Sequence, residues 1–255
     1  MTADQQPDMS PADPDDAELI PAATVLLLRE ANGREDSEVD REAPAAVGGG
    51  GMEVLMLRRN SKIAFGGMWV FPGGRVDDDE MVPGDVLGSA RFAAVREVEE
   101  ETGLTIDGEA LLTWSYWVPP PMPAMTTKGP RRRFSTWFFV APAPTGSVAI
   151  DHGEIHEHRW LSPTEALAQH RAGEIELVPP TWITLTQLSR HDDPAAAMAW
   201  AERTEPEEFR TRPLGGQPVA ICWAGDAAHA DGNADQAGPR HRLTLDPDGW
   251  RYERS

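Results

Sequence analysis

The sequence predicts an α/β sandwich with a mixed β-sheet and a helical and hairpin extension at its C-terminal end. Three runs rich in aliphatic and aromatic residues indicate buried strands, at residues 20–28, 52–57 and 134–141. Helical segments with recognisable caps lie among these runs, without the regular strand–helix alternation that builds a parallel sheet. The 255 residues are enough for one domain with additions.

The first two predicted strands are expected to pair across a long insertion. Residues 30–51 carry mixed charges and end in consecutive glycines, a composition typical of a flexible loop. A shorter apolar stretch between two glycine pairs, residues 65–74, predicts a further strand. The acidic residues 77–89 predict turns.

A helix is predicted at residues 91–102, and Gly103 is a natural residue to end it. At about 100° per residue, Phe92 and Val98 fall on one side of this helix. We expect that side to face the core, because apolar side chains on one face of a helix are usually buried.

Three glutamates share another side of the same helix. Glu97, Glu100 and Glu101 follow the spacing i, i+3, i+4, which gathers them within an arc of about 100°, whereas Glu99 lies well away from them. Negative charge in the last two turns opposes the helix dipole by roughly 0.3–1 kcal/mol per charge. A divalent cation would offset this cost, because such ions prefer carboxylate oxygens. A solvated acidic face is the alternative interpretation.

The second half of the chain is predicted to add strands, helices and a closing hairpin. The proline-rich and basic residues 119–133 predict a loop between two of the strands. The strand-like runs lie within residues 104–118 and 157–161, the helices begin after Ser162 and cover 181–189 and 193–200, and the hairpin covers 240–252.

Residues 74–104 resemble the Nudix box. That pattern is a Gly, five residues, a Glu, seven residues, and then Arg-Glu-apolar-x-Glu-Glu-x-Gly-apolar. Residues 96–104 match the helical half at every specified position, and five residues separate Gly74 from Glu80. Fifteen residues, rather than seven, lie between Glu80 and Arg96. The helical half is therefore intact, and the role of Glu80 stays open.

The wider resemblance covers roughly residues 20–185 and implies a Nudix-type α/β/α sandwich. Within the family, the sequence is more narrowly similar to the branch related to peroxisomal-type coenzyme A diphosphatases. The resemblance implies a pyrophosphohydrolase that cleaves the diphosphate bond of a nucleoside diphosphate linked to another moiety, with coenzyme A or acyl-coenzyme A as candidates. A non-catalytic nucleotide-binding regulatory module of the same fold is the alternative. The stretches that carry the narrower similarity are residues 55–61, 70–77, 133–139 and 179–181.

The resemblance also implies a Mg²⁺ or Mn²⁺ cofactor. Its expected ligands are Glu97, Glu100 and Glu101, helped by the carbonyl of Gly73. Arg96 stands four residues before Glu100 and would orient that carboxylate as an ion pair.

A general base is also required, and three glutamates are candidates for it. Family members use a box glutamate or one from a later loop, so Glu100, Glu154 and Glu157 all remain open. Arg58 and Arg133 are candidates for contacting substrate phosphate, because guanidinium groups bind phosphate well.

Two further groups of residues have a structural alternative to a role in binding. Trp114, Trp117 and Trp137 could stack on a base, but core packing is the favoured interpretation. The basic residues within 128–133 could hold phosphate, but a solvated loop is favoured.

The predicted organisation has three parts. Residues 1–17 form a disordered acidic tail, residues 18–170 form the Nudix hydrolase domain with residues 30–51 as its loop insertion, and residues 171–255 form an extension packed on that domain.

Composition narrows the expected partners and location. The formal net charge of −19 makes nucleic acid and anionic membranes poor partners. The single cysteine, Cys222, cannot form an intramolecular disulfide. The first residues lack the basic and apolar regions of a signal peptide, and no apolar run has transmembrane length. We therefore expect a cytoplasmic protein that binds a small diphosphate compound, and the resemblance is compatible with a homodimer.

Overall fold

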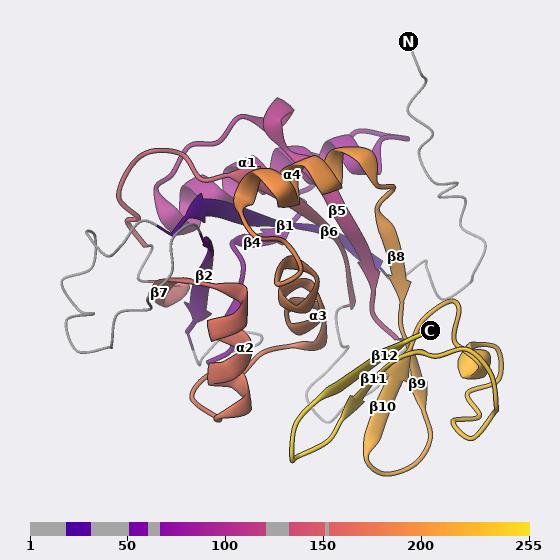
Figure 1. The fold of residues 1–255 in the computed structure, drawn as a ribbon. Coiled ribbons are helices and arrows are strands. Elements are labelled where there is room, and N and C mark those ends of the chain that lie inside the picture. Colours follow the sequence, from indigo (N-terminus) through magenta and orange to yellow (C-terminus); the bar gives the residue numbers. More distant parts are fainter. Residues whose placement is uncertain (1–18, 32–50, 61–66, 121–132, 151–152) are drawn as a thin grey trace.

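The structure contains one large β-sheet and a second, smaller sheet (Figure 1). The computed structural model describes residues 19–31, 51–60, 67–120, 133–150 and 153–255. Within these residues the large sheet has the order β3-β2-β1-β6-β5-β8, with β4 beside β1 and β7 beside β2. The β1–β6 and β5–β8 pairs are parallel and the others antiparallel, so the predicted mixed sheet is confirmed. Its strands are β1 (Leu19–Glu30), β2 (Met52–Arg59), β3 (Trp69–Val70), β4 (Gly73–Arg75), β5 (Leu112–Val118), β6 (Arg133–Pro142), β7 (Ile155–Leu161) and β8 (Glu207–Arg210).

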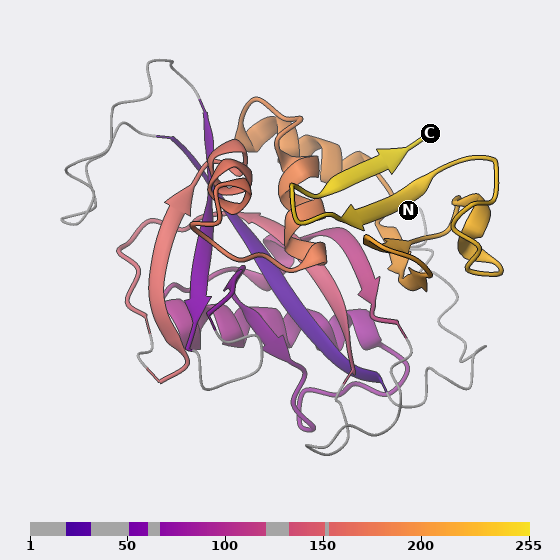
Figure 2. The same cartoon turned by 90° about the horizontal axis from the view of Figure 1, so that it is seen from below.

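Helices cover both faces of the large sheet, which makes the predicted three-layer α/β/α sandwich (Figure 2). Side chains alternate along β1 between the two faces. Val25 and Leu27 pack in the core beneath α1, whereas Leu26 and Leu28 pack in the core with α3 and α4. The helices are α1 (Val86–Thr102), α2 (Pro163–Arg171), α3 (Pro179–Leu188) and α4 (Pro194–Arg203).

Helix α1 differs from its prediction at its start and on its buried face. It begins at Val86 rather than at residue 91, because the Asp85 side chain caps it by accepting the Gly88 N–H at 2.7 Å. The expectation that Phe92 faces the core is wrong, since this side chain is 61% exposed. The buried stripe of α1 runs through Ala90, Ala93, Ala94 and Val98, so the expectation for Val98 is confirmed.

The large sheet splits between β1 and β2, and this split positions the glycine pair Gly73 and Gly74 beneath α1. The two strands pair only where residues 28–30 meet residues 52–54. Beyond that point β3 pairs with β2 and β4 pairs with β1. The connection is fixed at Pro72, whose carbonyl accepts the Val25 N–H at 2.9 Å and the Thr24 hydroxyl at 2.7 Å.

The C-terminal third adds to the large sheet and forms the small one. Strand β8 lies parallel to β5, at the edge of the large sheet. Trp117 of β5 stacks on Phe209 of β8 with ring centroids 4.0 Å apart, and Trp223 packs edge-on against both rings. The predicted closing hairpin is present as β11 and β12. The strands of the small sheet are β9 (Arg212–Leu214), β10 (Val219–Cys222), β11 (His241–Leu245) and β12 (Arg251–Arg254).

Some predictions concern parts of the chain that the structure does not describe. The acidic tail at 1–17, residues 32–50 of the loop insertion and residues 121–132 of the basic loop lie outside the described residues. The division at residues 170 and 171 stays a prediction. Trp114, Trp117 and Trp137 are all buried, as the core-packing interpretation predicts. Within the described residues, no helix is long and apolar enough to cross a bilayer.

A buried ion pair holds the small sheet together. The carboxylate of Asp226 is fully buried and accepts hydrogen bonds from Arg242 Nη2 at 2.6 Å and Arg242 Nε at 2.8 Å. It also accepts the backbone N–H of His241 at 2.9 Å. Burial favours the neutral acid, but these hydrogen bonds outweigh it and hold the pKa of Asp226 below its usual range.

We expect Arg242→Met to destabilise the protein by about 3–5 kcal/mol, because it leaves the buried Asp226 charge without its counter-ion. Arg251→Met is the matched control: Arg251 is an exposed arginine of the same sheet, and its loss should change stability by less than about 0.5 kcal/mol. Urea unfolding followed by tryptophan fluorescence measures both. Equal, small effects of the two variants would contradict a stabilising role for the ion pair.

Candidate metal and catalytic site

The last two turns of α1 present three carboxylates at the split of the sheet. The Glu101 side chain is 5% exposed, that of Glu97 14% and that of Glu100 59%. Glu97 and Glu101 therefore turn toward β4, whereas Glu100 stays largely exposed to solvent. The helix ends as predicted at Gly103, which adopts a left-handed conformation (φ 68°) and donates its N–H to Glu99 O at 2.8 Å.

The glycine pair of β4 lets the backbone approach these carboxylates closely. Gly73 donates its N–H to Glu101 Oε2 at 2.8 Å. A Cβ atom at Gly74 would overlap the Glu97 carboxylate, and one at Gly73 would overlap the carbonyl of Ala23. Any larger residue at either position would push β4 and these neighbouring groups apart, so only glycine allows this close contact between β4 and the carboxylates.

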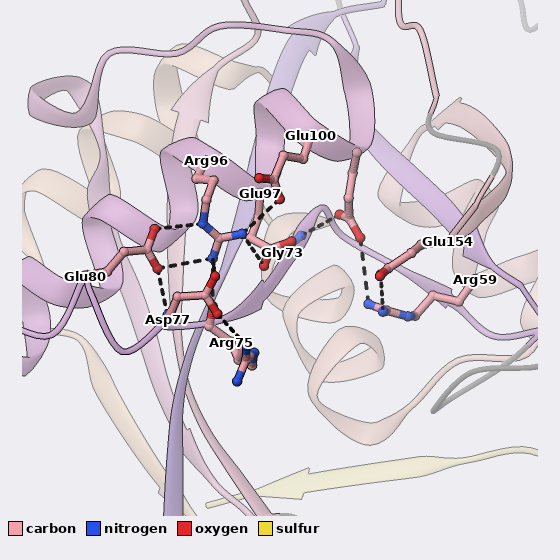
Figure 3. Close-up of polar contacts among 10 residues, drawn as sticks. Arg59, Gly73, Arg75, Asp77, Glu80, Arg96, Glu97, Glu100 and Glu154 are labelled. Atoms are coloured by element: carbon pink, nitrogen blue, oxygen red, sulfur yellow. Dashed lines mark hydrogen bonds and ion pairs between the residues drawn. The ribbon is translucent and has the colours of Figure 1, made fainter.

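Arg96 is the centre of a charged network on one flank of the cluster (Figure 3). Its Nη1 contacts Glu97 Oε1 and Glu100 Oε2, each at 2.9 Å, so the expected pair with Glu100 is present. Its Nε lies 2.8 Å from Glu80 Oε1. The other oxygen of Glu80 accepts the Asp77 N–H at 2.8 Å, which fixes that carboxylate. Glu80 thus reaches Arg96 despite the additional residues between them.

Burial controls the charge of the cluster. It raises the pKa of Glu101 to about 8, although the Gly73 N–H and the nearby Arg59 favour the ionised form. Burial also raises the pKa of Glu97, against the opposing effect of Arg96. Arg96 itself keeps its charge, because its bonds to Glu80 and Glu97 raise its pKa. Two of the three carboxylates therefore lack full compensation by protein groups.

The donor set fits a divalent cation. Glu101 Oε1 is buried and accepts no hydrogen bond within the described part of the chain. Its nearest cationic partner is Arg59 Nη1, at 3.8 Å. Among the described residues, no three acidic, histidine or cysteine side chains are already arranged to bind a metal ion together. Arg96 contacts Glu97 and Glu100, so a cation would have to compete with it for their oxygens.

Arg59, the last residue of β2, and Glu154 lie beside the carboxylates, and Arg59 is a residue that the sequence did not predict there. Glu154 immediately precedes β7, and its charge contributes to the raised pKa of both Glu97 and Glu101. Its Oε2 lies 3.2 Å from Arg59 Nη2. Side chains alternate between the two faces of a strand, and Leu55 and Leu57 lie beneath α1. The same alternation predicts that Arg59, two residues after Leu57, faces α1 as well.

The remaining predicted residues lie away from the carboxylates. Glu157 pairs with Arg159 at 2.7 Å and with Arg58 at 3.6 Å. Arg133 is buried at the start of β6 and donates to Pro119 O at 2.9 Å. It stands opposite Leu19 in the sheet, whereas Gly73 stands opposite Thr24, roughly 16 Å further along at about 3.3 Å per residue. The structure therefore does not bring Arg133 to the cluster.

Stability of the metal-free protein should depend on pH through Glu101. Because the pKa of this group is raised in the folded state, its stabilising contribution is complete below the ordinary value of 4.5 and is lost as the pH rises through about 8. We expect the free energy of unfolding in EDTA to fall between about pH 5 and about pH 8. The free energy of unfolding of the Glu101→Gln variant should fall less over this range. Urea unfolding at a series of pH values measures the difference, and equal slopes for the two proteins would exclude this assignment.

Comparison with known proteins places the chain in a family. A model of the NUDIX domain matches residues 40–180. The Caenorhabditis elegans protein "Putative nudix hydrolase 7" is 26% identical over 237 residues, which cover 76% of this chain and 77% of that protein. The acyl-coenzyme A diphosphatase NUDT19 of Xenopus laevis is 33% identical over 81 residues, 31% of this chain but only 20% of its own length. RNA pyrophosphohydrolase of Dinoroseobacter shibae is 29% identical over 108 residues, which cover 39% of this chain and 62% of that protein.

The fold agrees with these similarities. The crystal structure of a NUDIX hydrolase from Alicyclobacillus acidocaldarius aligns with a TM-score of 0.53 at 21% identity, over 71% of this chain and 96% of that one. The NUDIX domain model covers more than half of the chain and includes the glycine pair, the whole of α1 and Glu154. The protein is therefore a member of the Nudix pyrophosphohydrolase family.

Proposed function

We propose that this protein uses Mg²⁺ or Mn²⁺ to cleave the diphosphate bond of a nucleoside diphosphate linked to a second moiety. The observation that carries the proposal is the convergence of Glu97 and Glu101 of α1 with the backbone of β4, with Glu100 beside them on the same helix face. One of these glutamates, Glu101, keeps a buried oxygen with no hydrogen bond among the described residues. A buried carboxylate in this state gains more from a cation than a solvated one would.

Glu97, Glu100 and Glu101 would hold the cation, together with the carbonyl of Gly73. When bound, it neutralises charge on diphosphate oxygens and makes water a better nucleophile. Arg96 keeps Glu97 and Glu100 on the same flank of the cluster, since its guanidinium is itself fixed by Glu80. The glycines of β4 let the backbone lie close to Glu97 and to β1 without a side chain in the way, which keeps the carboxylates in place.

Glu154 is the general base that the contacts favour. Its charge acts on Glu97 and Glu101, whereas Glu157 is engaged by Arg159 and Arg58. In the proposed step, Glu154 takes a proton from water while the water oxygen bonds to one phosphorus. The bond from that phosphorus to the bridging oxygen breaks, and the second phosphate leaves with the bridging oxygen.

Coenzyme A or an acyl-coenzyme A is the substrate class that we favour. The support is the partial similarity to the acyl-coenzyme A diphosphatase of Xenopus laevis, which includes less than a third of this chain. An RNA substrate is less suited to a protein with a net charge of −19, because RNA binding depends on basic groups that neutralise phosphates.

Turnover on a panel of diphosphate compounds tests the proposal. The panel contains coenzyme A, acyl-coenzyme A, NADH, ADP-ribose, nucleoside triphosphates and dinucleoside polyphosphates, each with Mg²⁺, with Mn²⁺ and with EDTA. We expect metal-dependent cleavage of one class, at the diphosphate bond. Nucleotide binding without any cleavage across the panel would instead favour the regulatory-module alternative.

Glu100→Gln should lower kcat by about 100-fold or more, because it removes a ligand of the group that stabilises developing charge. Glu99→Gln is the matched control, since Glu99 is the exposed neighbour on the same helix and lies outside the cluster. It should retain full turnover. Steady-state kinetics at saturating Mn²⁺ compare the two, and full turnover by Glu100→Gln would end the metal-ligand assignment.

Gly74→Ala should lower turnover roughly 10- to 100-fold by displacing the Glu97 carboxylate, which the added Cβ would overlap. The fold should persist, because the displaced group is the end of a flexible side chain. Gly215→Ala is the control, since a Cβ there meets nothing within 4 Å. Turnover and circular dichroism are measured together. Unchanged turnover in Gly74→Ala would mean that Glu97 does not need its observed place.

A further inference from the structure

Arg59 occupies a backbone position that is fixed on both sides. It is the last residue of β2, and the register between β2 and β7 shifts between Arg58 and Arg59. Its N–H donates to Met68 O at 3.1 Å, and its carbonyl accepts the Gly67 N–H at 2.9 Å. The residue left unpaired at this shift is His156 of β7, so the alternation along β2 continues and turns Arg59 to the same face as Leu57, beneath α1. Such irregularities occur often beside active sites.

The Arg59 guanidinium contacts two carboxylates, and its ion pair with Glu154 is drawn in Figure 3. Its Nη2 is 3.2 Å from Glu154 Oε2, and its Nη1 is 3.8 Å from Glu101 Oε1. The Arg59 side chain is only 20% exposed, whereas that of Glu154 is 58% exposed. A largely buried cation therefore contacts one exposed carboxylate and one buried carboxylate at once.

We propose that Arg59 is a positioning residue that holds the Glu154 carboxylate beside the α1 glutamates, where it can accept a proton from water. The backbone of Glu154 is already fixed, because its carbonyl accepts the Asn60 N–H at 2.8 Å. Its side chain still has several rotatable bonds, and an exposed glutamate samples many rotamers unless a partner selects one. The ion pair with Arg59 supplies that selection. This inference rests on the proposed hydrolytic function and on Glu154 as its base.

A direct contact between Arg59 and substrate is the rival role. Arg59 Nε is buried and has no hydrogen-bond partner within the described residues, so a phosphate oxygen could accept from it. The two roles predict different kinetics. A positioning residue acts on kcat through Glu154, whereas a substrate contact that is equal in ground state and transition state acts on KM.

A kinetic double-mutant cycle separates these roles. The proteins are wild type, Arg59→Met, Glu154→Gln and the double variant, all measured at saturating Mn²⁺ on the substrate that the panel identifies. We expect Glu154→Gln to lower kcat about 10²- to 10⁴-fold. Arg59→Met should lower kcat about 10- to 100-fold with KM changed by less than about twofold. The double variant should be no slower than Glu154→Gln alone, since Arg59 has nothing to position without its partner.

Two further variants sharpen the kinetic result. Arg59→Lys keeps a positive charge and should recover part of the kcat that Arg59→Met loses. Arg29→Met removes another arginine–glutamate pair of the large sheet, with Glu53 at 2.8 Å, and should leave kcat and KM unchanged. Glu53 stands six residues before Arg59 on β2, so this control lies away from the cluster.

A second cycle measures the same contact without any turnover. Urea unfolding of the four proteins in EDTA reports whether Arg59 and Glu154 interact when no metal is present. We expect a coupling of roughly two- to fivefold in the unfolding equilibrium constant, as for a partly exposed ion pair. Arg29→Met combined with Glu154→Gln should show no coupling.

The outcomes distinguish this inference from the proposed function. Wild-type protein that cleaves no diphosphate would overturn the proposed function itself. Active wild type combined with multiplicative effects in the kinetic cycle would overturn only the role of Arg59. So would a rise in KM at unchanged kcat for Arg59→Met, or the absence of coupling in EDTA.

Discussion

The site depends on one close contact between a helix and a strand, the hydrogen bond from the Gly73 N–H to Glu101 Oε2. It requires β4 to lie directly beneath the end of α1, and that in turn requires β1 and β2 to separate. Any side chain at Gly73 or Gly74 would fill the space that the carboxylates occupy or collide with β1. The place of the buried glutamates therefore depends on both the split of the sheet and the glycine pair.

Two arginines, on opposite flanks of the site, partly offset the negative charge of the glutamates. Arg96 contacts Glu97 and Glu100 on one flank and is tied back to Glu80, while Arg59 approaches Glu101 and Glu154 on the other. Glu101 nevertheless keeps a raised pKa, because burial removes more stabilisation from its charged form than the Gly73 N–H and Arg59 restore. An under-compensated group of acids is the electrostatic state that a divalent cation relieves.

The C-terminal third stabilises the face of the sheet opposite to this chemistry. Phe209 and Trp223 pack in the same core as residues of β1, β2 and β6, whereas α1 covers the other core. Most of this third lies beyond the region that the NUDIX domain model matches. The additional strand β8 also covers what would otherwise be the free edge of β5, and unpaired edges are liable to associate with other chains.

The sequence by itself determined the elements whose signals are local. The buried strands followed from their apolar runs, the end of α1 from Gly103, the closing hairpin from its turn residues, and the grouping of Glu97, Glu100 and Glu101 from helical spacing. The start of α1 was predicted wrongly, because Gly88 in its first turn is a residue that disfavours helices. The exposure of Phe92 was predicted wrongly, because the residues of a helix do not show which of its faces will meet the sheet.

Only the tertiary structure decided which distant residues meet at the site. Glu80 reaches Arg96 because the chain turns back at Asp77, and Arg59 reaches Glu154 because the end of β2 pairs with the start of β7. Arg133, which its charge made a plausible phosphate ligand, lies several residues along the sheet from Gly73. Helical spacing fixes which side chains of one element share a face, but the pairing and register of strands fix which elements that face meets.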